Sequence, residues 1–195
     1  LENIYSQMGL DIHTPSDGSG KCYTYDSANT VDLDFNLLGY NIHINKEDNL
    51  LFSLSQDKLD RITSRIDKSF TTFYKMIDIA GFDVAAHYLF DALHVLTCNI
   101  NLYNAKKGVK VGIFYSNQLL DNKKNLSYLD GQLKRNIGRL NLSSKKSIAI
   151  AHRTAIEEIL KRKLALLSFT KGFDYPHKRY KIKKQRLRTI KSSWV

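Results

Sequence analysis

The chain has few cysteines and no long apolar segment. Its 195 residues include two cysteines, Cys22 and Cys98, and neither belongs to a Cys-x-x-Cys motif. This usage favours reduced thiols over a disulfide framework and is typical of cytoplasmic proteins. No run approaches the roughly 18 apolar residues of a membrane-spanning helix, and no secretory signal pattern opens the chain. We therefore expect a cytoplasmic protein whose partners do not include a membrane.

A natural starting segment is also absent. The sequence opens on residues 1–5, Leu-Glu-Asn-Ile-Tyr, without a methionine. This pattern is typical of the middle of a helix, so we expect a fragment of a longer protein that is cut within a domain. With 43% hydrophobic residues, the chain has enough apolar material for one or two cores, which excludes a wholly disordered protein.

Acidic residues are scarce in the second half of the chain. Residues 1–104 hold 7 Lys and Arg against 14 Asp and Glu, whereas residues 105–195 hold 23 against 5. The second half thus carries a charge of +18 and the first half −7. Contacts from Lys and Arg to phosphates dominate the affinity of most nucleic-acid-binding proteins, so the asymmetry indicates a surface for a polyanion. The alternative is a solvated basic face without a partner.

The apolar periodicity predicts an α+β chain that is mostly helical. Apolar residues recur at spacings of three and four, which is typical of helices with one buried face. Ser55 is the expected N-cap of the first long helix, and Gly81 is its expected end. Asp83 is the expected N-cap of the second helix, and Ser143 or Ser144 that of the fourth. The predicted helices cover residues 56–80, 83–103, 125–140 and 145–167.

The first of these helices carries an apolar stripe and a cationic flank. Arg61, Arg65 and Lys68 lie off the stripe at spacings of four and three, so they are neighbours along one flank. In this arrangement they could follow the backbone of a nucleic-acid duplex, although interleaved aspartates offer ion pairs within the helix instead. The expected buried stripe consists of Leu59, Ile62, Ile66, Phe70, Phe73 and Ile77. In the fourth helix, the residues that share one side include Ile148, Ile156, Ile159 and Leu166.

A strand pattern precedes the first long helix. Residues 34–44 alternate apolar and polar side chains on either side of Gly39. The alternation predicts a half-buried strand with a bend or a close backbone approach at the glycine. Residues 50–52 are predicted to form a second short strand or an apolar plug.

The sequence around this glycine resembles part of a known enzyme family. Residues 37–40, Leu-Leu-Gly-Tyr, are followed by a polar link and a helix with basic residues. This order is similar to the primer-grip hairpin and the start of the thumb in bacterial reverse transcriptases of the retron and group II intron kind. In a primer grip, the backbone turn approaches the primer and places its 3′ hydroxyl for reaction. The alternative is an ordinary hairpin bulge.

Two further segments resemble elements of the defence-associated and abortive-infection reverse transcriptases. Residues 96–99, Leu-Thr-Cys-Asn, are similar to their Leu-Thr-Gly-Asn element, with Cys98 in place of the glycine. Residues 111–117, Val-Gly-Ile-Phe-Tyr-Ser-Asn, are similar to their Val-Gly-Ile-Tyr-Tyr-Ser-Asn element. Asn99 and Asn117 either form hydrogen bonds across the link between these segments or contact nucleic acid.

A third resemblance lies near the start of the chain. Residues 8–13, Met-Gly-Leu-Asp-Ile-His, are similar to motif D of the reverse transcriptase palm. The family commonly has an asparagine and, three residues later, a lysine that helps to protonate the leaving pyrophosphate. Here His13 and Ser16 stand at these positions. His13 is a candidate proton donor because imidazole titrates near neutral pH, and the alternative is a surface histidine.

Together, the resemblances occur in the order expected for the C-terminal part of an RNA-directed DNA polymerase, and this succession implies that part of the enzyme. They imply the end of a palm over residues 1–54, a helical thumb over 55–142, and a basic C-terminal helix and tail over 143–195. The partners of such an enzyme are an RNA template, a DNA primer, deoxynucleotides and, in some members, an associated non-coding RNA. Likeness to the defence-associated group implies an antiphage role.

The same resemblance implies two Mg²⁺ ions held by palm aspartates. No Tyr/Phe-x-Asp-Asp motif occurs in this sequence, so the ligands are expected before Leu1, and the chain should be inactive alone. We predict no metal site within the chain, since the spacing of His13, Lys21 and Cys22 fits no zinc pattern. His87 and His94 are interpreted as structural.

The C-terminal segment combines aromatic and basic residues. Residues 175–194 interleave tyrosines and a tryptophan with Lys and Arg, a composition suited to RNA or single strands through stacking and phosphate neutralisation. The alternative is a frayed, solvated terminus. The full set of expected nucleic-acid contacts is Leu38, Gly39, Tyr40, Arg61, Arg65, Lys68, Asn99, Asn117, Lys134, Arg135, Arg139, Lys178, Arg179 and Lys181.

Two other functions are compatible with the sequence. One is a non-enzymatic RNA-binding protein whose basic second half works by itself. The other is a helical protein–protein adaptor, whose binding would respond little to salt, whereas nucleic-acid binding weakens steeply as salt rises.

Overall fold

The computed structural model of the chain describes residues 33–47, 49–102, 110–146, 148–177 and 179–195. This part is α+β and mostly helical, as the sequence predicts. The motif D-like segment with His13, and the residues Lys21 and Cys22, lie outside the described residues, as does Lys178.

A small antiparallel sheet precedes the helices. It consists of β1 (Leu33–Leu37), β2 (Tyr40–Ile44) and β3 (Leu50–Leu54), in that order. The bend predicted at Gly39 is a two-residue hairpin turn between β1 and β2, in which Leu38 and Gly39 have φ values of 51° and 82°. Positive φ at both central residues is the signature of a type I′ turn, whose twist matches that of the flanking strands.

The helix α2 (Gln56–Ala80) begins and ends where the sequence predicts. The Ser55 hydroxyl accepts a hydrogen bond from the Lys58 backbone N–H at 3.4 Å. Gly81 follows the last turn with a φ of 83°, a conformation that glycine adopts readily. All six residues of the predicted apolar stripe are buried, so this part of the prediction is confirmed.

The next helix, α3 (Phe82–Thr97), is shorter than predicted. Residues beyond Thr97 form β4 (Asn99–Leu102), which pairs antiparallel with β5 (Lys110–Gly112). The prediction of a helix to residue 103 is wrong because these strand hydrogen bonds replace the helical ones. The N-cap is Gly81 without a side-chain hydrogen bond, and Asp83 lies in the first turn instead.

The helix α4 (Lys124–Gly138) agrees with the prediction, whereas α5 (Ile150–Leu164) begins about five residues late. The N-cap of α5 is Ala149, and neither predicted serine caps it. This helix buries Leu160 and Leu164, and it leaves Ile159 53% exposed. Apolar residues occur all round α5, so the sequence period alone does not select its buried face.

The C-terminal segment folds back onto the helices. It forms α6 (Phe169–Asp174), β6 (Arg179–Ile182) and α7 (Lys184–Ser192). β6 pairs in parallel with β4 and completes a second sheet in the order β5-β4-β6. The alternative of a frayed, solvated terminus does not hold for α7, because its Leu187 and Ile190 pack with Tyr88, Ala92 and Ile100.

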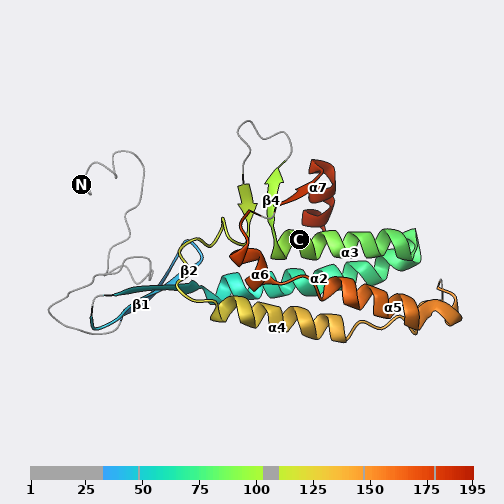
Figure 1. Cartoon of the computed structure of the whole chain (residues 1–195), viewed down its shortest axis with the longest axis horizontal. Helices are drawn as coiled ribbons and strands as arrows, with labels where there is room; N and C mark the ends of the chain where they lie inside the picture. Colours follow the sequence, from blue (N-terminus) through green and yellow to red (C-terminus); the bar gives the residue numbers. More distant parts are fainter. Residues whose placement is uncertain (1–32, 48, 103–109, 147, 178) are drawn as a thin grey trace.

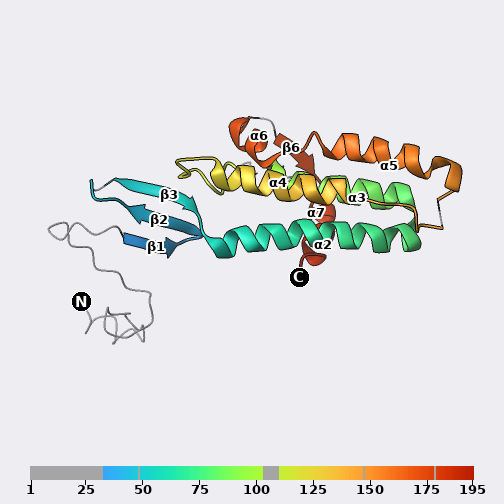
Figure 2. The same ribbon diagram turned by 90° about the horizontal axis from the view of Figure 1, so that it is seen from below.

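The elements form a helical body with the first sheet at one end. α2, α3 and α4 lie side by side and share most of the apolar core (Figure 1). β1, β2 and β3 project from the end where α2 begins, and α5 lies at the opposite end (Figure 2). α7 packs on α3, on the side of the body away from α4.

Candidate nucleic-acid interface

The turn of the β1–β2 hairpin is exposed and is fixed to the start of α2. The Leu38 side chain at its tip is 87% exposed. The Ser55 backbone N–H donates a hydrogen bond to the Gly39 carbonyl at 3.1 Å. The same serine caps α2, so the position of the turn relative to that helix is determined by backbone contacts.

Lys58 connects this turn to the surface of α2. Its ammonium group donates a hydrogen bond to the Ser116 carbonyl at 3.2 Å and lies 4.9 Å from the centroid of the Tyr40 ring. The Tyr40 hydroxyl donates to the same carbonyl at 3.4 Å. A Cβ atom at Gly39 would lie 3.1 Å from the Lys58 Cδ atom, so the lysine stem passes directly beside the turn.

Lys58 extends the predicted cationic flank toward the turn. We call the set Lys58, Arg61, Arg65 and Lys68 the α2 flank. Burial lowers the pKa of Lys58, and the nearby charge of Arg61 lowers it further. The same two causes, in the same order, lower the pKa of Arg65. These cations are thus close enough to repel one another, and an anion placed along the flank relieves that repulsion.

The far end of the α2 flank contacts Trp194. The Arg65 guanidinium lies 5.2 Å from the centroid of the Trp194 ring, and the Lys68 ammonium donates to the Trp194 carbonyl at 2.9 Å. The indole N–H of Trp194 donates to the Ser69 hydroxyl at 2.9 Å. Arg61, at the centre of the flank, is exposed and has no hydrogen-bond or ion-pair partner among the described residues.

The predicted cations of α4 lie on a different side of α2. The Asn136 amide of α4 donates to the Asp67 carboxylate at 3.0 Å. Asp67 is two residues from Arg65, which corresponds to about 200° around the helix. α4 and the C-terminus lie on opposite sides of α2 in both views (Figures 1 and 2). The structure therefore does not bring the exposed residues Lys134, Arg135 and Arg139 into one groove with the α2 flank.

Asn99 and Asn117 lie inside the protein, with exposures of 0% and 2%. The Asn99 amide donates to the Gly172 carbonyl at 2.7 Å, and its oxygen accepts from the Phe114 N–H at 3.0 Å. The Asn117 amide donates to the Ile113 carbonyl at 2.5 Å. Of the two roles left open for these asparagines, the structure shows internal hydrogen bonding, and burial corrects their assignment as nucleic-acid contacts.

Asn99 and Asn117 are the last residues of the segments 96–99 and 111–117, and these two segments lie side by side in the structure. Asn99 pairs with Gly112 across β4 and β5. A Cβ atom at Gly112 would lie 2.4 Å from the Cys98 carbonyl oxygen, and one at Gly172 would lie 1.7 Å from that of Thr97. The backbone at residues 97–98 is thus closely approached by other segments of the chain. The glycines that allow this approach are Gly112 and Gly172, which lie in the approaching segments and not at position 98.

The remaining predicted contacts belong to β6. Arg179 and Lys181 are exposed, whereas the intervening Tyr180 is partly buried and Ile182 is buried. This alternation is a strand signal that the sequence contained. The Tyr180 hydroxyl donates to Asp91 at 2.7 Å, and Arg186 donates to the other oxygen of that carboxylate at 2.6 Å.

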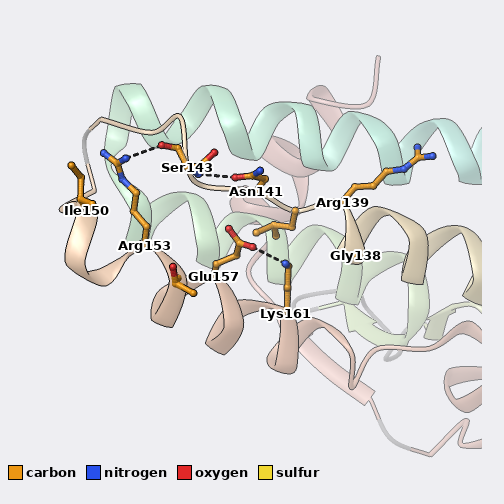
Figure 3. A pocket seen from close by; sticks show the side chains of 10 residues that line it. Gly138, Arg139, Asn141, Ser143, Ile150, Arg153, Glu157 and Lys161 are labelled. Carbon is orange, nitrogen blue, oxygen red and sulfur yellow. Dashed lines mark hydrogen bonds and ion pairs between the residues drawn. The ribbon is translucent and has the colours of Figure 1, made fainter.

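A polar pocket of about 600 Å³ lies between the end of α4 and α5 (Figure 3). Lys161 is ion-paired in it, whereas Arg153 bonds only to neutral backbone carbonyls. Lys161 donates to Glu157 at 2.6 Å, and Arg153 donates to the Ser143 and Ile148 carbonyls at 2.7 and 2.9 Å. The carboxylate of Glu157 thus offsets part of the positive charge of this pocket.

Candidate metal ligands are scattered over the described residues. No three His, Cys, Asp or Glu side chains among them gather as a metal ion requires. The His87 ring nitrogen lies 2.8 Å from the Asp83 carbonyl oxygen, and the His94 ring stacks on Tyr180 at 4.2 Å. These contacts agree with the interpretation of both histidines as structural.

Comparison with protein-family models, curated proteins and solved structures finds no match for this chain. Within the described part of the chain, no helix combines the length and the apolar character needed to cross a bilayer.

Proposed function

We propose that the chain is the duplex-holding part of an RNA-directed DNA polymerase. In this proposal, the turn of the β1–β2 hairpin and the α2 flank contact a template-primer duplex. The observation that supports it most directly is the attachment of the exposed turn to the cationic flank through Lys58, which touches Gly39, Tyr40 and Ser116.

The chemical contribution of such a site is positional. Gly39 allows a backbone to approach the primer closely, and the α2 flank supplies charges for phosphates. The Mg²⁺ ions of such an enzyme do not fit the described residues, which contain no cluster of candidate ligands. We therefore assign no catalytic step to this chain, and we place it in the cytoplasm with an RNA template and a DNA primer as partners. An antiphage role and an associated RNA rest only on the resemblance of residues 96–99 and 111–117.

The proposal is tested by binding of an RNA–DNA hybrid with a recessed 3′ end, measured by fluorescence anisotropy over a range of salt. We expect Arg61→Ala to weaken binding and to reduce the slope of log K against log salt by about one. Arg162→Ala is the matched control, because Arg162 is also exposed but lies in the last turn of α5, outside the hairpin and α2. Absence of hybrid binding, or equal effects of the two substitutions, contradicts the proposal.

A second measurement concerns activity. We expect the pure chain to bind the hybrid and to incorporate no nucleotide, because the paired aspartates are absent from its sequence. Nucleotide incorporation by repeated preparations of the chain that are free of contaminating polymerase contradicts this expectation.

The packing of β6 and α7 favours a second candidate, a non-enzymatic RNA-binding protein, because it fixes part of the basic second half on the helical body. This candidate predicts that single-stranded RNA competes fully with the hybrid and that the recessed 3′ end makes no difference. The polymerase proposal predicts preference for the hybrid.

A further inference from the structure

The helix α7 carries a row of cations within the basic segment 175–194, none of which is among the individually expected nucleic-acid contacts. Lys184, Arg188 and Lys191 follow one another at spacings of four and three, so they lie along one side of the helix. All three side chains are exposed and have no hydrogen-bond or ion-pair partner among the described residues. We call these three residues the α7 row.

The opposite side of α7 is firmly attached to the body. Leu187 and Ile190 are buried against α3 and β4. The Ser193 hydroxyl is hydrogen-bonded to the Tyr88 hydroxyl. The row is thus presented by an anchored helix, which loses less entropy on binding than a frayed terminus would.

The local charge around the row is of one sign. Residues 175–195 contain 8 Lys and Arg and no Asp or Glu. At 1.5 Å per residue, the row from Lys184 to Lys191 is about 10 Å long. One strand of a duplex carries about three phosphates over that length, which equals the number of cations in the row.

Trp194 places the end of this row close to the α2 flank. The Trp194 backbone N–H donates to the Lys191 carbonyl at 3.2 Å, while its own carbonyl accepts from Lys68 at 2.9 Å. One residue therefore contacts both the last member of the α7 row and the last member of the α2 flank.

We propose that the α7 row is a second phosphate-contacting surface, which holds the backbone of the same hybrid duplex that the α2 flank contacts. This inference rests on the proposed function and adds a site formed by Lys184, Arg188 and Lys191. The three contacts account for a slope of about 2.7 in log K against log salt.

The test compares the triple variant Lys184→Ala, Arg188→Ala, Lys191→Ala with a control of equal charge, Lys146→Ala, Arg162→Ala, Lys171→Ala. The control residues are exposed and lie outside α7 and α2. We expect the first variant to reduce the slope of log K against log salt for hybrid binding by about 2.7. The ratio of wild-type to variant affinity should therefore fall roughly 40-fold between 50 and 200 mM salt. The control should reduce the slope by less than one.

The outcomes separate the inference from the function on which it rests. If the wild-type chain does not bind the hybrid, the proposed function fails. If it binds and the two triple variants behave alike, only net charge matters and the α7 row is refuted. Loss of binding to single-stranded RNA alone, with the hybrid slope unchanged, also refutes it. Circular dichroism checks folding, and if the triple variant is unfolded, each single substitution should reduce the slope by about one.

Discussion

At the residue scale, Leu38 stands in a conformation that is unfavourable for leucine. Its φ is 51° and its side chain is 87% exposed, so no burial offsets the strain. We predict that Leu38→Asn raises the free energy of unfolding by about 1 kcal/mol, because asparagine tolerates this region at the first position of a type I′ turn. Urea denaturation measures the change. Gly39→Ala is the counterpart and should destabilise, since its φ is 82° and a Cβ would lie 3.1 Å from Lys58.

The same substitution tests whether the leucine serves the proposed site. If the Leu38 side chain contacts the duplex, Leu38→Asn weakens hybrid binding while it stabilises the fold. Strained residues at functional sites commonly show this opposition. Unchanged affinity in the stabilised variant would remove Leu38 from the interface.

Single residues also show how far the sequence determined the fold. Ser55, Gly81 and the stripe of α2 were predictable because a cap, a terminator and a regular period agree over 25 residues. α7 was not predictable in this way, because Leu187 and Ile190 are few among many cations. Contacts with Tyr88 and Ala92, about 100 residues earlier in the chain, decide that α7 folds.

At the scale of elements, α6 packs closely against the end of α3 because Gly172 of α6 has no side chain. A Cβ atom at Gly172 would lie 1.7 Å from the Thr97 carbonyl oxygen. We predict that Gly172→Ala destabilises the protein by at least about 3 kcal/mol, since backbone must move to accept the methyl group. Gly131→Ala is the control. Gly131 lies within α4 with nothing within 4 Å of its Cβ position, so this change should stabilise by about 0.5–1 kcal/mol. Thermal unfolding distinguishes the two directions.

The contact between α3 and β6 should respond to alkaline pH. Burial, and then the hydrogen bond to Asp91, raise the pKa of Tyr180 to about 12. The unfolded value is about 10, so the folded state favours the neutral phenol. The resulting stabilisation is complete below about pH 10 and is lost as the pH rises to about 12. We predict that the stability difference between the wild type and Tyr180→Phe shrinks over this interval. Urea midpoints at pH 8 and at successive alkaline values measure it, and a constant difference contradicts the prediction.

At the scale of the whole molecule, the sequence revealed that the second half of the chain is basic, but not which sides of the folded protein carry the basic residues. Helical spacing assigned Arg61, Arg65 and Lys68 to one flank, and this assignment agrees with the structure. It did not reveal which neighbour covers which side of α2, because tertiary packing sets that choice. Consequently, the α4 cations, which were expected nucleic-acid contacts together with this flank, lie on a different side of α2, where Asn136 bonds to Asp67.

Trp194 attaches the residues after α7 to α2. Trp194→Ala removes the indole hydrogen bond to Ser69 and the contact with Arg65. We expect the free energy of unfolding to fall by about 1–3 kcal/mol, because the indole is partly buried and its contacts are polar as well as apolar. Val195→Ala is the control, since Val195 is 100% exposed. Hydrogen exchange should show faster exchange of the α7 amides in Trp194→Ala than in the control. Equal protection would mean that α7 is held by its apolar face alone, and that Trp194 does not connect the α7 row to the α2 flank.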